Sequence, residues 1–239
     1  MQKYDAILFD LDDTLIDNDE SMKYAIYETC KTLGISCNDD IFMKWKQFDI
    51  DYWTEWENGT FTFPHWANLQ HQKINFLRSY RFVSFFKDLA IDYEKAVDIN
   101  KAYNLLLAKN VKLIDGAYEL ISDLSNHYEL IISTNGDKKA AYNKVKVANI
   151  MPYIDNIVAS GECGFSKPMP EFFRYVINRM HTKNRNKMLI VGDSLRTDIL
   201  GGIYSGIDCC WFNQHYKENT LGMEPTYEIN TLKELVKKL

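Results

Sequence analysis

The sequence has few cysteines and no long hydrophobic run, and both absences restrict the kind of protein that it encodes. Five cysteines occur among 239 residues, and no two of them form a C-x-x-C pair. We therefore expect reduced thiols that pack as small hydrophobic side chains, with Cys209 and Cys210 on opposite faces of a strand. No apolar stretch approaches the roughly 18 residues that a membrane-spanning helix requires, so we expect no membrane span.

Basic residues are not in excess either, because 28 lysines and arginines stand against 33 aspartates and glutamates, a net charge of −5. This composition does not supply the extended basic face of a protein that binds nucleic acid polymers. The five histidines show no mutual spacing that is typical of a metal site. No charged-then-apolar leader precedes the first predicted strand, so we expect a cytoplasmic protein.

The most informative segment is YDAILFDLDDTL at residues 4–15. Its apolar run, residues 6–9, predicts a short buried strand, and Asp10, Asp12 and Thr14 follow at the carboxyl end. Because side chains in a strand repeat every two residues, both carboxylates can leave the sheet on one side. Two uncompensated carboxylates repel each other, and Mg²⁺, which prefers oxygen ligands, relieves that repulsion. The segment predicts a magnesium site and a phosphate-like substrate.

The rest of the chain divides into a helical block, residues 17–110, and a part in which strands and helices alternate. In the second part strands are predicted at 128–133, 157–159, 188–191 and 209–212, and helices at 137–149, 169–182 and 195–205. This alternation indicates an α/β fold with a parallel sheet and helices on both faces, which the strand at residues 5–10 must join. The helical block is then an insertion after the first strand.

Tryptophans concentrate in the helical block. Trp45 shares a helical stripe with Ile41 and Phe48, which predicts that it packs in a small helical core. Other aromatic side chains of the block stay open as substrate contacts, and these are Trp53, Trp56, Phe61 and Trp66.

Three further segments place polar side chains after strands or in loops. Residues 133–136 (STNG) end a strand and open a helix, where hydroxyl and N–H groups suit a phosphate oxygen. Residues 166–168 (SKP) supply a cation, and residues 192–194 (GDS), with Asp198 beyond them, supply carboxylates. Since open parallel sheets place their chemistry at the carboxyl ends of strands, these groups form a set for phosphoryl transfer through an aspartyl-phosphate.

These four motifs, in this order, resemble those of the haloacid dehalogenase superfamily, in its phosphatase branch, and the resemblance covers essentially the whole chain. Residues 198–206 (DILGGIYSG) and 210–213 (CWFN) are most similar to the housekeeping pyrimidine 5′-nucleotidases. The resemblance implies a Rossmann-like core of residues 1–16 and 111–239, and a mobile helical cap of residues 17–110 inserted after the first strand.

The resemblance also implies roles for the carboxylates. Asp10 would be the nucleophile, and Asp12 would protonate the leaving oxygen and then take a proton from the hydrolytic water. Mg²⁺ would be held by the Asp10 carboxylate, the Asp12 backbone carbonyl and Asp193. Asp198 would orient the water shell of the metal, or Lys167, without binding the metal itself.

The same resemblance implies a phosphate-binding set. Thr134, the Asn135 amide and Lys167 would bind the transferring phosphoryl group and offset its charge. The loop before the lysine, residues 160–164 (SGECG), departs from the family pattern of an acidic residue directly after the serine. This departure leaves the role of Glu162 open.

Several of these residues also have an ordinary structural interpretation. The run from Asp10 to Thr14 favours turns, and Thr134 with Asn-Gly after it is a turn sequence. Asp13 falls on the other parity of the strand, which favours a structural or solvated side chain. Asp198 could simply cap a helix. The order of all four motifs is what favours the functional interpretation.

The sequence thus predicts a Mg²⁺-dependent phosphomonoester hydrolase that is a monomer or weak dimer and acts on a small molecule. By resemblance the substrate is a nucleoside 5′-monophosphate. A sugar-phosphate phosphatase or a phosphomutase shares the core motifs and stays an alternative. A haloacid dehalogenase has no need of Asp12 as an acid, a receiver domain lacks the second aspartate, and a non-catalytic relative would be expected to lose a motif.

Overall fold

The computed structural model describes residues 2–64, 67 and 73–239. The chain divides into two compact units. One combines residues 1–20 with 111–239, and the other is residues 21–110.

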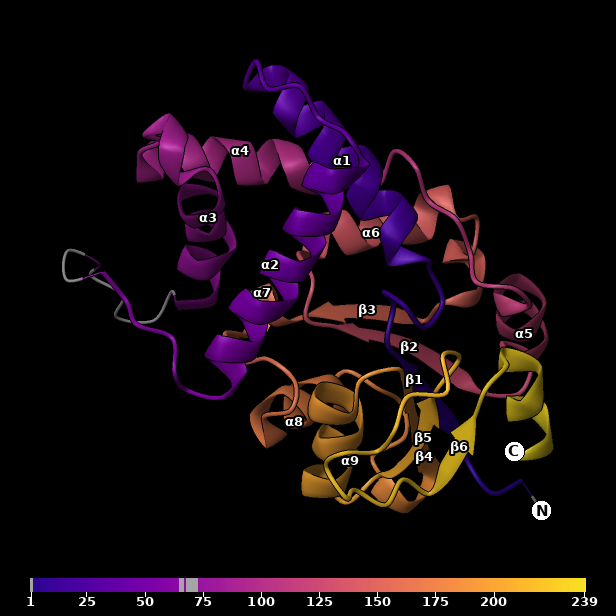
Figure 1. The fold of residues 1–239 in the computed structure, drawn as a ribbon. Helices are drawn as coiled ribbons and strands as arrows, with labels where there is room; N and C mark the ends of the chain where they lie inside the picture. Colours follow the sequence, from indigo (N-terminus) through magenta and orange to yellow (C-terminus); the bar gives the residue numbers. More distant parts are fainter. Residues whose placement is uncertain (1, 65–66, 68–72) are drawn as a thin grey trace. The chain divides into compact units, whose positions relative to one another are not determined.

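The first unit is built on a parallel sheet with the strand order β3-β2-β1-β4-β5-β6 (Figure 1). The strands are β1 (Ala6–Phe9), β2 (Glu129–Thr134), β3 (Asn156–Ala159), β4 (Met188–Gly192), β5 (Asp208–Phe212) and β6 (Tyr227–Ile229). The central strand β1 pairs on both sides, with Leu8 opposite Ile131 of β2 and Ile190 of β4. Its carboxyl end therefore lies between those of β2 and β4.

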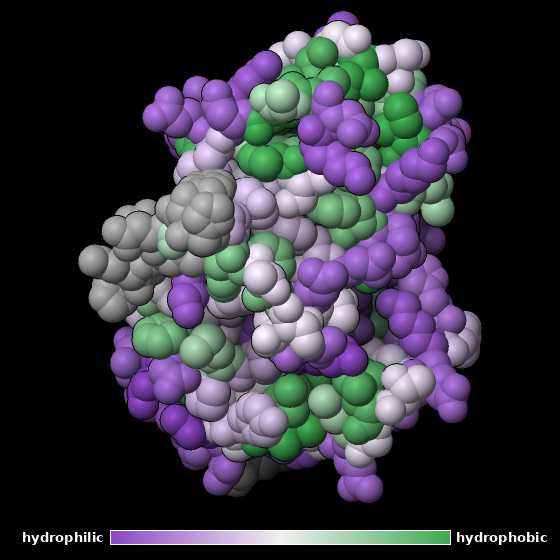
Figure 2. Space-filling view, turned by 60° about the vertical axis from the view of Figure 1, so that its left-hand side comes forward, coloured by the Kyte–Doolittle hydropathy of each residue, from purple (hydrophilic) through white to green (hydrophobic). Residues whose placement is uncertain are grey.

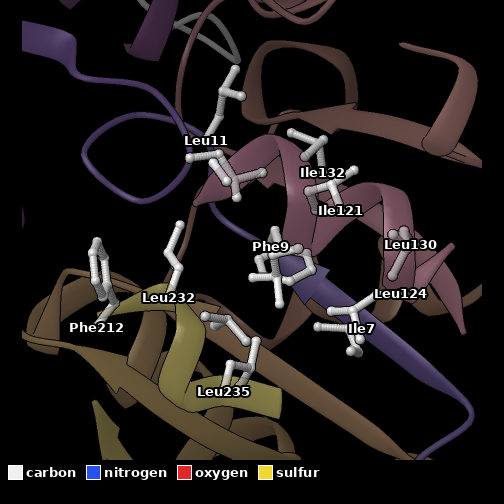
Figure 3. Packing of buried hydrophobic residues seen from close by; sticks show 14 of the residues in the cluster. Ile7, Phe9, Leu11, Ile121, Leu124, Leu130, Ile132, Phe212, Leu232 and Leu235 are labelled. Atoms are coloured by element: carbon white, nitrogen blue, oxygen red, sulfur yellow. The ribbon is translucent and has the colours of Figure 1, made fainter. Parts of the chain in front are cut away.

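Alternate residues of the strands pack into two separate hydrophobic cores, one on each face of the sheet. Ile7 and Phe9 are fully buried in a core on one face of the sheet, which Figure 3 shows together with Leu232 and Leu235. Ala6 and Leu8 belong to the core on the other face. Cys210 lies in the first core and Cys209 in the second, and all five cysteines are free thiols, which confirms the prediction for this pair.

Helices cover both faces of the sheet, which confirms the predicted α/β fold class. The longer ones are α5 (Ala117–Leu124), α6 (Lys138–Val147), α8 (Pro170–Ile177) and α9 (Leu200–Ser205). Short helical segments are η2 (Met151–Tyr153), α7 (Ser160–Cys163), η3 (Arg185–Lys187), η4 (Leu195–Ile199) and η5 (Leu232–Lys237). Buried residues of α5 and η5 lie in the core of Phe9, and those of α8 in the core of Leu8.

Several predicted elements differ from the structure in their bounds or in the type of helix. The helix predicted at 169–182 ends at Ile177, and the chain turns after it although Met180 is still buried. The helix predicted at 195–205 begins as a π-helical turn, η4, before it becomes α-helical. The predicted first strand, 5–10, is shorter and ends at Phe9. Helix α5, strand β6 and segment η5 were not predicted, although α5 has buried residues at helical spacing and η5 begins with a capping box; β6 has only three residues.

The second unit is helical, with α2 (Asp39–Glu57), α3 (Lys73–Phe85), η1 (Lys87–Leu89) and α4 (Tyr93–Leu106); α1 (Asn18–Thr32) begins in the first unit. Side chains of Asn38 and Asp92 accept backbone N–H groups at the starts of α2 and α4. These hydrogen bonds satisfy donors that the first helical turn leaves without a partner.

Aromatic packing forms the core of the helical unit. Trp45 is fully buried, stacks on Phe82 with ring centroids 5.1 Å apart, and its indole N–H donates to the Tyr103 hydroxyl at 3.2 Å. The predicted core role of Trp45 is confirmed. Trp53 and Trp56 are half-buried, so a substrate contact stays a prediction for them, and Trp66 lies outside the described residues.

The described helices include none that is both long enough and apolar enough to cross a membrane. On the face shown in Figure 2, hydrophobic side chains lie in small groups between hydrophilic ones.

Candidate active site

Asp10 lies directly after β1, where the strand pairing continues for one more residue. Its backbone N–H donates to the Val191 carbonyl at 2.9 Å, and its side chain is buried, with 7% of the residue exposed. The chain then turns through Asp13, which has a φ of 62°. The two carboxylates predicted to leave a strand together therefore lie in the loop after it, and Asp12 is half-buried.

Lys167 is the central cation of the site. Its Nζ donates to Asp10 Oδ1 at 2.5 Å, to Asp198 Oδ1 at 2.6 Å and to the Ser133 carbonyl at 2.9 Å. The side chain is buried, so these three oxygens replace water around the ammonium. Asn135 holds the backbone of the lysine in place, because its side-chain amide accepts the Lys167 N–H at 2.8 Å and donates to the Lys167 carbonyl at 3.1 Å.

Three carboxylates converge beside this ammonium. Oxygen atoms of Asp10, Asp193 and Asp198, one from each side chain, all lie within 4.8 Å of one another. Asp198 uses both oxygens for donors of the protein, since Oδ1 accepts Lys167 and Oδ2 accepts the Ser194 N–H at 3.2 Å. Asp193 has no ion pair in the described part of the chain. Asp193 is therefore better suited than Asp198 to bind a cation directly.

Close packing at the end of β4 places Asp198. A Cβ atom at Gly192 would lie 2.2 Å from Asp198 Cγ, so only glycine fits there without a shift. Asp193 is held from the backbone, because its N–H donates to Thr14 Oγ1 at 3.1 Å and its carbonyl accepts the Trp211 indole N–H at 2.9 Å. Sequence reasoning did not assign a role to Trp211.

Burial, together with the neighbouring carboxylates, raises the pKa values of Asp10 and Asp193 in the cluster. Burial, opposed by Lys167 and assisted by Asp198, raises the pKa of Asp10 to about 7. Burial, and then Asp10 and Asp198, raise the pKa of Asp193 well above its usual value. Burial opposes the charge of Lys167, but Asp10 and Asp198 outweigh it and raise the pKa of this lysine. Two buried carboxylates, Asp10 and Asp198, and the half-buried Asp193 are oxygen donors of the kind that Mg²⁺ prefers, so the donor set fits this ion.

Thr134 ends β2 next to the cluster. Its residue is buried, its Oγ1 accepts the Gly136 N–H at 2.9 Å, and within the described residues the hydroxyl hydrogen has no acceptor. Ser160 Oγ donates to the Asn135 carbonyl at 3.1 Å and fixes the turn from the side of β3. A buried hydroxyl that is still able to donate is suited to an anionic oxygen.

Asp12 has a partner that sequence reasoning missed. Lys144 of α6 donates to Asp12 Oδ1 at 2.6 Å and to Asn18 Oδ1 at 3.1 Å, and its side chain is 2% exposed. A signal existed in the sequence, because Lys144 shares a helical face with the buried residues Ala140 and Ala141. Asp13, expected to be structural or solvated, is structural, since Oδ1 accepts the Asn18 N–H at 3.1 Å.

The structure thus brings Asp10, Lys167, Asp193 and Asp198 into direct proximity and places Thr134 and Asn135 on the adjoining turn. Glu162, whose role the sequence left open, is half-buried and pairs with the exposed Lys138 at 2.9 Å. This contact does not assign Glu162 to the site.

Comparison with known proteins gives consistent matches along the chain. A family model for haloacid dehalogenase-like hydrolases matches residues 4–206. YfnB of Bacillus subtilis is 33% identical over 235 residues, which is 98% of this chain and 95% of that protein. The crystal structure of YfnB, described as bound to magnesium, has a TM-score of 0.86 at 32% identity and covers 100% of this chain and 99% of that one.

Two further relatives carry a more specific name. The pyrimidine 5′-nucleotidase YjjG of Escherichia coli is 28% identical over 233 residues, 98% of this chain and 96% of that protein. The pyrimidine 5′-nucleotidase PynA of Streptococcus pneumoniae is 28% identical over 236 residues, 98% of this chain and 94% of that protein.

Proposed function

Because the chain belongs to the haloacid dehalogenase-like hydrolases, we propose that it is a Mg²⁺-dependent phosphomonoester hydrolase that reacts through an aspartyl-phosphate at Asp10. The observation that carries this proposal is the convergence of Asp10, Lys167 and Asp193 at the carboxyl ends of parallel strands. A buried carboxylate beside a single buried ammonium is a nucleophile placed where negative charge can be neutralised.

In the first half-reaction an Asp10 oxygen attacks phosphorus and the bond from phosphorus to the leaving oxygen breaks. Asp12 gives its proton to that oxygen. In the second half-reaction water attacks phosphorus, Asp12 takes a proton from the water, and the bond to Asp10 breaks to release phosphate. One carboxyl group can serve both steps because each step returns it to the protonation state that the other needs.

The remaining residues stabilise charge. Lys167, the Thr134 hydroxyl and the Asn135 amide would bind the phosphoryl oxygens, whose charge is spread over them in the transition state. The Asp10 carboxylate, the Asp12 carbonyl and Asp193 would hold Mg²⁺, which would neutralise part of the same charge when bound. Asp198 would act on the site through Lys167, which it contacts at 2.6 Å.

We assign residues 1–16 and 111–239 to the catalytic core and residues 17–110 to a cap that excludes bulk water during the reaction. The preferred substrate is a small molecule in the cytoplasm, a nucleoside 5′-monophosphate with a pyrimidine base. The names of YjjG and PynA, at 28% identity over nearly whole chains, support this substrate class. Trp53, Trp56 and Phe61 are candidates for stacking on the base.

The test is phosphate release from a panel of nucleoside monophosphates and sugar phosphates, with Mg²⁺ and with a chelator. We expect Mg²⁺-dependent release that is fastest with pyrimidine nucleotides. Asp10→Asn should abolish turnover and retain the fold, because a carboxamide is a far poorer nucleophile and metal ligand. Near-normal Mg²⁺-dependent release by this variant would refute the assignment of the nucleophile.

A further inference from the structure

Lys144 of α6 is a buried charged residue that the proposed reaction does not use. We infer that it is a positioning residue, which holds one carboxylate oxygen of Asp12 so that the other oxygen faces the reacting phosphoryl group. This inference rests on the proposed function and specifies how the acid–base group of that function is oriented.

The burial of Lys144 requires an explanation. The other lysines of α6 (Lys138, Lys139 and Lys146) are exposed, whereas the Lys144 side chain is 2% exposed. Removing an ammonium from water carries a penalty of several kcal/mol, on the order of that for other buried ions, and a buried ion pair often adds no net stability. A methionine of similar length would satisfy the packing, so the position favours a chemical role for the charge.

The two oxygens of Asp12 have different surroundings. Oδ1 accepts the Lys144 ammonium at 2.6 Å, while Oδ2 has no hydrogen-bond partner among the described residues. The ideal Cβ position of Gly136 lies 3.8 Å from Asp12 Oδ2 and 3.1 Å from Thr134 Oγ1. Oδ2 is therefore directed toward the turn that would bind the phosphoryl group, and the lysine is on the other oxygen.

The lysine is itself held on two sides. Its ammonium also donates to Asn18 Oδ1 at 3.1 Å, and the Asn18 backbone N–H donates to Asp13 Oδ1 at 3.1 Å. Helix α6 begins directly after the phosphate-binding turn, where the Asp137 side chain accepts two backbone N–H groups. One rigid element therefore links the turn to the orientation of Asp12. The proton that reaches the leaving oxygen comes from Asp12, and Lys144 takes no part in the transfer.

The experiment compares kcat/KM for two substrates, an alkyl phosphomonoester from the panel and p-nitrophenyl phosphate. This constant reports only the phosphorylation step, and the p-nitrophenolate leaving group needs no general acid. We expect Lys144→Met to lower kcat/KM for the alkyl ester about 100-fold and for the aryl ester only a few-fold, because misplacing a catalytic group costs on the order of 10²-fold. Asp12→Asn should show the same selectivity, and Lys146→Met, on the exposed face of α6, should change neither constant.

Two results would contradict a positioning role for Lys144. An equal loss on both substrates, or no loss, would overturn the inference, because either result makes Lys144 a structural residue only. If Lys144→Met does not fold, Lys144→Gln keeps hydrogen-bond donors without the charge and replaces it. The same comparison then applies, between the loss of kcat/KM for the alkyl ester and the loss for the aryl ester. If the wild-type protein releases no phosphate from either ester with Mg²⁺, the proposed function fails instead.

Discussion

Replacing Lys167 by methionine should destabilise the protein in a way that depends on pH. The ammonium lies within 2.6 Å of both Asp10 Oδ1 and Asp198 Oδ1, and all three side chains are buried. Without it, three carboxylates share the site with no lysine. Removing one partner of a buried ion pair typically destabilises by about 3–5 kcal/mol, because the remaining charge is uncompensated.

The carboxylates can avoid this penalty by taking up a proton. Burial, opposed by Lys167, already raises the pKa of Asp10 to about 7, and the substitution removes the opposing effect, so this pKa should rise further. A carboxyl group with a raised folded-state pKa stabilises the fold below its unfolded pKa and loses that contribution as the pH rises. The variant should therefore lose stability more steeply than the wild type above about pH 7, by about 1.4 kcal/mol per pH unit for one additional bound proton.

Thermal unfolding at about pH 5.5 and about pH 8, in the presence of a chelator, measures the effect. Because the wild type keeps its Asp10 proton up to about pH 7, one additional proton corresponds to about 1.4 kcal/mol between these values, and for a chain of this size each kcal/mol shifts the melting temperature by about 2–4 °C. The deficit of the variant should therefore be small at the lower pH and about 3–6 °C larger at the higher pH. Lys146→Met serves as the exposed control. An equal deficit at both values would show that lost packing, rather than uncompensated charge, explains the destabilisation.

Two further predictions concern the same cluster. Mg²⁺ should raise the melting temperature of the wild type more at about pH 8 than at about pH 5.5, because protons on Asp10 and Asp193 must leave before a cation binds. An equal shift at both pH values would argue against a metal site at these residues. Gly192→Ala should destabilise by about 1–3 kcal/mol in denaturant unfolding and lower activity, since its Cβ would overlap Asp198; an unchanged midpoint and rate would contradict this packing argument.

The strands that carry the site could be predicted because their signals are local. Residues 6–9, 130–132 and 188–191 are short apolar runs, and each lies in a buried strand of the sheet. Since all are parallel, the polar residues that follow them must meet at one edge. The convergence of Asp10 with Lys167 and Asp193 follows from that topology without any knowledge of side-chain geometry.

Other elements could not be predicted because contacts with distant segments of the chain determine them. Strand β6 has three residues and forms by pairing with β5, so no pattern of its own distinguishes it from a loop. Helix α8 ends at Ile177 although Met180 is still buried, because Met180 reaches the core from a turn after the helix. The partners of buried charges could not be predicted for the same reason. The contact between Lys144 and Asp12, for example, joins residues that are far apart in sequence.

The roles proposed for the two aspartates agree with the lysine that each one contacts. The parity argument treated Asp10 and Asp12 as equivalent carboxylates on one side of a strand, but the strand ends at Phe9 and the chain turns through Asp13. Asp10 is then buried against Lys167 in a cluster with excess negative charge, whereas Asp12, with 29% of its side chain exposed, meets Lys144. A nucleophile benefits from burial beside the group that binds the phosphoryl oxygens, and an acid–base group must reach the leaving oxygen and the hydrolytic water. Two lysines from different elements thus give neighbouring carboxylates the separate environments that the proposed two-step reaction requires.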